Sequence, residues 1–140
     1  MTEFLSRNKS LQISKTFFSN DGSVKYVLST EDNRKIEAIY FPFEGNFDGK
    51  KISANVICLS SQVGCPIRCS FCETRRMENP RNLSKEELIL QLNLITSNLE
   101  SNNRRPVDSV AMMGMGEPLL NLNNVLEFYD AAKERPNPVS

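Results

Sequence analysis

Three of the four cysteines of the chain stand close together, in the run Cys65-Pro-Ile-Arg-Cys69-Ser-Phe-Cys72. Thiolates are the usual protein ligands of iron–sulfur clusters, and three of them on one tight loop can hold three irons of a 4Fe–4S cube. The fourth iron then has no protein ligand and can take a small molecule instead. The C-x₃-C-x₂-C spacing therefore indicates a cluster with one open iron.

Two other kinds of cysteine site remain as alternatives. A structural zinc site wants four Cys or His ligands, but the chain has no histidine, so Cys58 is the one remaining candidate. A disulfide scaffold belongs to secreted chains, and the N-terminal residues 1–9 lack the apolar core of a signal peptide. We expect a chain of the reducing cytosol, in which the spacing favours the cluster over zinc or disulfides.

The composition limits the range of functions. With 140 residues and 39% hydrophobic residues, the chain should form one domain or a piece of a larger one. No stretch approaches the roughly 18 consecutive apolar residues of a membrane span. Lys and Arg together equal Asp and Glu at 17 each, so no global field attracts nucleic acid. Residues 66–85 are locally basic and could form a rim that contacts phosphates, although an ordinary solvated loop explains this charge too.

The N-terminal part of the chain is expected to contain a small β-hairpin. Residues 1–20 are polar and predict an irregular lead-in. Apolar runs at residues 25–30 and 35–41, separated by a short polar turn, predict two paired strands. Residues 43–50 are expected to form a connecting loop.

The remaining chain alternates between strands and helices. Residues 54–60 and 109–115 predict buried strands, and residues 84–99 and 123–134 predict helices. The first helix begins at a capping box formed by Ser84 and Glu87. A strand–helix–strand unit of this length favours parallel strands. The loops that follow the two strands should then meet at one edge of the sheet, where α/β proteins keep their sites.

The loop after the second strand contains Gly114, Gly116 and Glu117, within the run Met-Gly-Met-Gly-Glu-Pro-Leu-Leu-Asn. Glycines allow a backbone to approach a ligand closely. An acidic residue near the start of a helix is favoured in any protein. By itself this loop is therefore a weak signal, and its position one strand after the cysteine loop makes it informative.

Together these motifs resemble the radical S-adenosylmethionine (SAM) enzymes, and among them the 23S ribosomal RNA adenine carbon-2 methyltransferases. Their antibiotic-resistance relatives, which methylate carbon 8 of the same adenine, share the pattern. The resemblance covers roughly residues 20 to 135. The matching runs are Cys58-Leu-Ser-Ser-Gln-Val-Gly-Cys65, Phe71-Cys72-x-Thr74, Arg81-Asn-Leu83 and the Gly-Glu-Pro loop.

The resemblance implies an α/β fold, consisting of the first two βα units of a partial (β/α)₆ barrel preceded by a small β-hairpin. The expected divisions are residues 1–20, 21–50 and 51–140. The resemblance also implies cofactors and site residues. In the family, the cysteines at the positions of Cys65, Cys69 and Cys72 hold a 4Fe–4S cluster whose open iron binds SAM. The expected SAM-binding residues are Phe71 near the adenine, Gly114, Gly116, and Glu117 paired with the amino group. Cys58 is expected to be catalytic, as a base and a resolving thiol.

The chain also departs from the family pattern. The family methylates a cysteine near its C-terminus, and no cysteine follows Cys72. We therefore expect this chain to be incomplete for catalysis, lacking the C-terminal half. The family's partners are ribosomal RNA, in some members transfer RNA, and an external electron donor. A non-catalytic iron–sulfur and SAM-binding remnant, or a radical SAM enzyme of another reaction type, remain alternatives.

Overall fold

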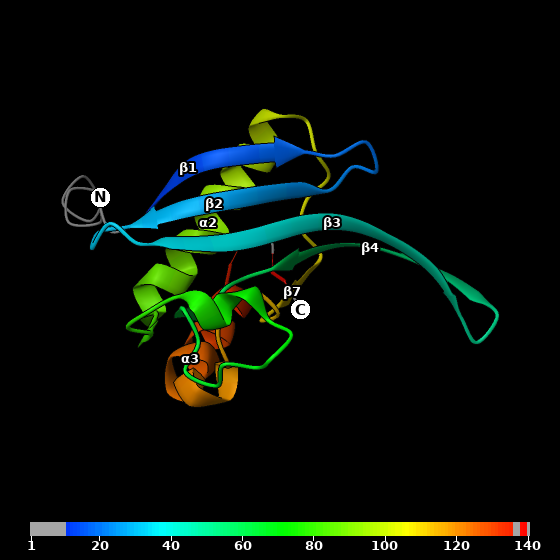
Figure 1. The fold of residues 1–140 in the computed structure, drawn as a ribbon. Coiled ribbons are helices and arrows are strands. Elements are labelled where there is room, and N and C mark those ends of the chain that lie inside the picture. The colour runs from blue at the N-terminus through cyan, green and yellow to red at the C-terminus, as the bar shows by residue number, and fades with distance from the viewer. Residues whose placement is uncertain (1–10, 136–137, 140) are drawn as a thin grey trace.

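The computed structural model describes residues 11–135 and 138–139, and it places one five-stranded sheet at the centre of the fold (Figure 1). The strand order is β1-β2-β3-β4-β7. Neighbours from β1 to β4 are antiparallel, whereas β7 runs parallel to β4. The bounds are β1 Leu11–Phe18, β2 Val24–Thr30, β3 Lys35–Phe47, β4 Lys50–Cys58 and β7 Ser109–Ala111.

Two helices pack with the sheet. Helix α2 (Lys85–Ser101) crosses one face of β1 to β3, and α3 (Leu122–Lys133) packs beside α2 (Figure 1). The Ser84 hydroxyl accepts from the Glu87 amide while the Glu87 carboxylate accepts from the Ser84 amide, so the capping box is confirmed. The apolar stripe of α2 lies in the core and consists of Leu88, Leu92, Ile95 and Leu99.

Two sequence-based expectations for the N-terminal part are wrong. Within the expected irregular lead-in, residues 11–18 form strand β1, while residues 1–10 lie outside the described part. The register of β1 against β2 shifts between Ile13 and Lys15, which breaks the alternation that would otherwise have indicated a strand. The expected connecting loop at 43–50 is also absent. Instead β3 and β4 continue as a paired arm that turns at Asp48 and Gly49.

The arm continues through Gly45 because Phe43 covers that glycine. A Cβ built on Gly45 would lie 2.8 Å from the Cζ atom of Phe43, so the ring occupies the space above the glycine. A neighbouring aromatic ring compensates for the missing side chain of a glycine in a strand. The arm therefore extends the sheet beyond the part that α2 covers.

A small two-stranded ladder closes the base of the cysteine loop. Strand β5 (Gln62–Val63) pairs antiparallel with β6 (Arg81–Asn82), so the residues between them form one closed excursion. The short 3₁₀ helix η1 (Glu73–Arg76) lies within this excursion. Among the described residues, no helix is sufficiently long and apolar to cross a membrane.

Arg81 links this ladder to the β2–β3 turn and to helix α2 through two ion pairs. Its Nη2 lies 3.0 Å from Asp32 Oδ1 and 2.8 Å from Glu87 Oε1, which joins the β2–β3 turn to the start of α2. The hydrogen bonds from Arg81 hold the pKa of Asp32 well below its usual range. Arg34, on the same turn, donates to the carbonyl oxygens of Glu78 and Asn79.

We expect Arg81→Gln to lower the free energy of unfolding by about 1 to 3 kcal/mol, because Glu87, whose side chain is 10% exposed, would lose its charged partner. Urea unfolding measures this loss. Lys25→Gln is the matched control, since it breaks the exposed 2.9 Å pair of Lys25 with Glu37 and should cost at most about 1 kcal/mol. Because the pKa of Asp32 is depressed, its contribution is present above the ordinary value of 3.8 and is lost as pH falls below it. The free energy of unfolding of Asp32→Asn should therefore fall less steeply with decreasing pH than that of the unchanged protein. Equal costs for Arg81→Gln and Lys25→Gln would contradict the assignment of a stabilising role to Arg81.

Candidate functional site

The cysteine loop lies between β5 and β6, and it carries Cys65, Cys69 and Cys72. All three are free thiols of intermediate exposure. A turn closes between the last two, where the Cys72 amide donates to the Cys69 carbonyl over 3.1 Å, and Arg68 beside it has a left-handed φ of 56°. Three free thiols within one short loop suit an iron–sulfur cluster in their chemistry.

The three thiols share the loop without forming a ready ligand group. Across the described residues, no set of three or more His, Cys, Asp or Glu side chains is gathered so that it could hold a metal ion. Phe71, at 90% exposure, points into solvent at the tip of the loop. The donor set therefore fits a cluster in residue type, and holding one requires the tip of the loop to draw its thiols together.

The loop after β7 lies directly against the segment that follows β4. The Gly114 amide donates to the Leu59 carbonyl over 2.9 Å. In return, the amides of Ser61 and Gln62 donate to the Met115 carbonyl over 2.9 and 3.2 Å. The structure thus brings the two motif loops together at the carboxyl ends of the parallel strands β4 and β7, as the topology predicted.

The two glycines of the second loop make this contact sterically feasible. A Cβ on Gly114 would lie 2.7 Å from the Leu59 carbonyl oxygen. Gly116 has a φ of +99°, and a Cβ there would lie 2.5 Å from the Cβ of Gln62. The sequence suggested close approach to a ligand as their purpose, whereas the structure shows close approach of the other loop.

Two amide side chains reinforce the junction, and sequence reasoning missed both. Gln62 accepts from the Glu117 amide over 2.9 Å and donates to the Asn82 side chain over 2.7 Å. Asn121, which is 3% exposed, donates to the carbonyls of Ser61 and Leu83, each over 2.8 Å. The available signal in the sequence was an amide residue close to an apolar strand. Such a side chain would be buried, and buried amides are nearly always hydrogen-bonded.

Glu117 stands at the start of the short 3₁₀ helix η2 (Pro118–Asn121). One of its carboxylate oxygens accepts from the Leu119 amide over 3.0 Å, which caps that helix. The second oxygen has no protein donor in the part of the chain that the structure describes. The residue therefore acts as a helix cap and still has an oxygen that could accept from a ligand.

A cavity of about 420 Å³ lies between the cysteine loop, the second loop and the open face of the sheet. It brings together Cys58, Cys72 and Gly114 from the predicted set, whereas Cys65, Cys69, Phe71, Gly116 and Glu117 are not among its lining residues. The residues that line it are Glu37, Ala38, Ile39, Cys58, Cys72, Glu73, Thr74, Met77, Met113, Gly114 and Met115.

The two cysteines at this cavity differ in their electrostatics. Burial raises the pKa of the Cys58 thiol, which is the last residue of β4 and lies opposite Ile39 and Ala111. A hydrogen bond from the Thr74 side chain lowers the pKa of Cys72. Cys58 therefore keeps its proton at neutral pH in this environment.

The basic cluster around the cysteine loop is largely neutralised. Arg76 pairs with Glu73 over 3.2 Å, Lys85 pairs with Glu127 over 3.5 Å, and Arg81 is held as described above. Within the described residues, Arg68 and Arg75 are the members of the cluster without a carboxylate partner. A phosphate-contacting rim, one of the two interpretations of this charge, would therefore have only these two side chains without an ion-pair partner among the residues that the structure describes.

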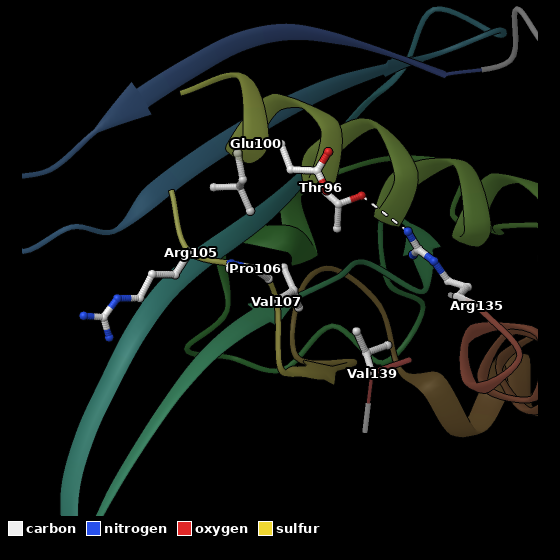
Figure 2. Close-up of a pocket in the computed structure, with 8 residues that line it drawn as sticks. Thr96, Glu100, Arg105, Pro106, Val107, Arg135 and Val139 are labelled. Carbon is white, nitrogen blue, oxygen red and sulfur yellow. Dashed lines mark hydrogen bonds between the residues drawn. The ribbon is translucent and has the colours of Figure 1, made fainter. Parts of the chain in front are cut away.

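A second, much smaller cavity of about 40 Å³ lies between α2 and the chain on either side of β7 (Figure 2). Arg135 reaches into it and donates to the Thr96 hydroxyl over 3.5 Å. Its other terminal nitrogen is buried without a partner among the described residues, in a space that has room for water. None of the predicted site residues lines this cavity.

We expect Gly116→Ala to disrupt the junction between the loops, because the new methyl group would overlap Gln62. Gly49→Ala is the matched control, since Gly49 also has a positive φ, of +76°, but has open space around it. Strain at a positive φ alone should cost about 1 kcal/mol, and we expect at least about twice that loss for Gly116→Ala. Thermal unfolding of the two variants separates the cost of the positive φ from the cost of the overlap with Gln62. Equal losses would show that the close contact does not constrain position 116.

Comparisons with known proteins place these loops in context. No family model matches the chain. Curated relatives named probable dual-specificity RNA methyltransferase RlmN align with about four fifths of it. The relative from Thermus thermophilus is 43% identical over 111 residues, which are 79% of this chain and 29% of that protein. The relative from Chlorobaculum tepidum is 39% identical over 113 residues, 81% of this chain and 28% of that protein. The chain thus spans less than a third of the length of these relatives.

A solved structure supports the same relationship. The crystal structure of a radical SAM methyltransferase from Sphaerobacter thermophilus superposes with a TM-score of 0.76 at 26% identity, and the match covers 95% of this chain and 38% of that one. The mixed α/β arrangement of sheet and helices is therefore similar to part of a radical SAM methyltransferase. Both comparisons agree with the resemblance stated from the motifs, and this chain is a partial-length relative of the RlmN family of radical SAM RNA methyltransferases.

Proposed function

We propose that this chain supplies the cluster-binding and SAM-binding part of a radical SAM methyltransferase that acts on adenine in RNA. The curated relatives are named dual-specificity RNA methyltransferases, and the resemblance of the motifs implies ribosomal RNA as the substrate, with transfer RNA as a second one. The observation that carries the proposal is the direct contact between the two motif loops at the ends of neighbouring parallel strands. In the complete protein these strands would begin a (β/α)₆ barrel.

Each of the predicted site residues would have its own role in binding the cluster or SAM. Cys65, Cys69 and Cys72 would hold a 4Fe–4S cluster, which supplies one-electron reductive cleavage of SAM when an external donor has reduced it. The second oxygen of Glu117 would accept from the amino group of SAM, a charge-assisted contact. The exposed ring of Phe71 would lie against the adenine of SAM.

Gly114 and Gly116 would contribute indirectly, by fixing the distance between Glu117 and the cysteine loop. Cys58 lies at the cavity that these loops border, where its thiol holds a proton. To act as a base towards RNA, the thiol must lose that proton, so bound substrate has to offset the effect of burial on its pKa. The neighbouring cavity provides the space in which an RNA base could reach the thiol.

We expect anaerobic reconstitution to load about four iron and four sulfide per chain, by the stoichiometry of the cube. Single Cys→Ala changes at 65, 69 and 72 should each abolish loading. Cys58→Ala is the control and should load fully, because Cys58 ends a strand outside the loop. Iron and acid-labile sulfide analysis reads out both results. Stable uptake of one zinc ion without sulfide would reject the cluster.

On the loaded protein, Glu117→Gln should weaken SAM binding by about tenfold, since a charge-assisted hydrogen bond is replaced by a neutral one. The cluster content should stay unchanged. Equilibrium dialysis with labelled SAM measures the affinity, and Glu127→Gln, on an exposed face of α3, is the control. If the affinity survives in Glu117→Gln, the residue is a helix cap alone and the SAM site lies elsewhere.

A further inference from the structure

Another polar cleft lies along β4, on the amino-terminal side of Cys58. Its volume is about 360 Å³. On β4 the lining residues Asn55 and Ser53 lie three and five positions before Cys58, roughly 10 and 17 Å along the strand at its usual rise. The cleft lies between the base of the β3–β4 arm and the connection from α2 to β7, which Figure 1 shows passing beside the arm. Its lining residues are Gly22, Tyr40, Pro42, Glu44, Ser53, Asn55, Asn103, Arg104 and Arg105.

Two adjacent guanidinium groups face this cleft without acidic partners. In the described part of the chain, neither Arg104 nor Arg105 forms an ion pair with a carboxylate. Arg104 is held in place, because its Nη1 donates to the Gly22 carbonyl over 3.5 Å and its Cζ lies 5.7 Å from the centre of the Phe18 ring. Arg105 is exposed, and its side chain points away from the Arg135 cavity (Figure 2).

The acidic side chains at the cleft, Glu44 and Asp108, have other partners. Glu44 lines the cleft, and the ammonium group of Lys51 lies 3.9 Å from its carboxylate. Asp108, beside the cleft, accepts from both the backbone and the side-chain amide of Asn55, over 2.7 and 2.8 Å. Since neither arginine has a carboxylate partner among the described residues, their remaining N–H groups can donate to an anion from outside the chain.

One aromatic ring, that of Phe18, lies next to the Arg104 guanidinium. Phe18 is in register with Val24 and Val24 with Tyr40, so the Phe18 ring lies in the same cross-strand row as a residue that lines the cleft. Phe17 and Phe18 are 52% and 53% exposed. A ring that already bears a guanidinium on one side can stack with a planar group on its free side.

We propose that this cleft binds a single-stranded segment of the RNA substrate, with its phosphates on Arg104 and Arg105 and a base stacked on Phe18. The proposal rests on the proposed function in that RNA is the substrate. Arginine forks match phosphate oxygens, and exposed rings beside them form the stacking platforms that bind single-stranded nucleic acid. A duplex offers no free base faces to such a ring. Because the cleft shares no lining residue with the cavity at the cysteine loop, it would hold a part of the RNA other than the target adenine.

Fluorescence anisotropy with a labelled short single-stranded RNA, on the chain without iron, SAM or reductant, tests the cleft. The Arg104→Gln/Arg105→Gln variant should bind about tenfold more weakly or worse. The slope of log affinity against log salt concentration should decrease by about 1.4, at roughly 0.7 for each lost phosphate contact. Phe18→Leu should lower the affinity about fivefold or more and leave that slope unchanged. The matched control, Lys15→Gln/Lys133→Gln, loses the same charge from exposed positions on β1 and α3.

Equal weakening in the arginine and lysine variants would overturn the proposal, because it would reduce the effect to net charge. Equal affinity for duplex RNA, or displacement of the RNA by polyglutamate at equal charge concentration, would overturn the single-stranded RNA assignment. Arg105→Gln alone keeps the test valid if the double variant unfolds, since that exposed side chain makes no contact that the fold requires. The readout needs no cluster, so a failure of cluster or SAM binding is measured separately.

Discussion

The direct contact between two backbones is the constraint on which the other features of the site depend. Residues 59–62 and 114–117 approach so closely that neither Gly114 nor Gly116 has space for a Cβ. The hydrogen bonds between these segments are individually modest, about 1 kcal/mol each. The steric limit is stricter, because a methyl group at either position would separate the loops. The glycines therefore set the position of Glu117 relative to the cysteine loop.

A group of buried hydrogen bonds around Ser60 and Gln91 fixes the position of that contact. Gln91, which is fully buried on α2, accepts from the Ser60 amide and donates to the Ser60 carbonyl over 2.9 and 3.0 Å. The Ser60 hydroxyl donates to the Glu37 carbonyl over 2.6 Å and accepts from the Met115 amide over 2.9 Å. An unsatisfied polar group at such a place would be costly. This one serine thus joins α2, β3 and both loops.

The sequence pattern was sufficient to predict those parts of the fold that rest on local interactions or on the order of the elements along the chain. The capping box and the apolar stripe of α2 are encoded within one helix, and the parallel pairing of β4 with β7 follows from the order of the elements. Strand β1 could not be predicted in this way, because its regular alternation is broken near Ser14 and its partner strand is what defines it. The arm was missed because Gly45 suggests a loop unless Phe43 is known to cover it. In the site, the spacing of the cysteines was visible, whereas the bond from Gln62 to the Glu117 amide depends on tertiary contact.

The cysteine loop combines a fixed base with an open tip, and this division has a thermodynamic consequence. The β5–β6 ladder and the bonds of Arg81 hold both ends of the excursion, while Phe71 and Ile67 at the tip are exposed. Fixing the backbone of a residue in a new conformation costs conformational entropy of about 1 to 2 kcal/mol. Because both ends of the excursion are already held, binding a metal cluster would have to rearrange only the short segment that carries the thiols. The affinity of the three cysteines for a cluster should therefore depend on Arg81, although that residue contributes no ligand atom.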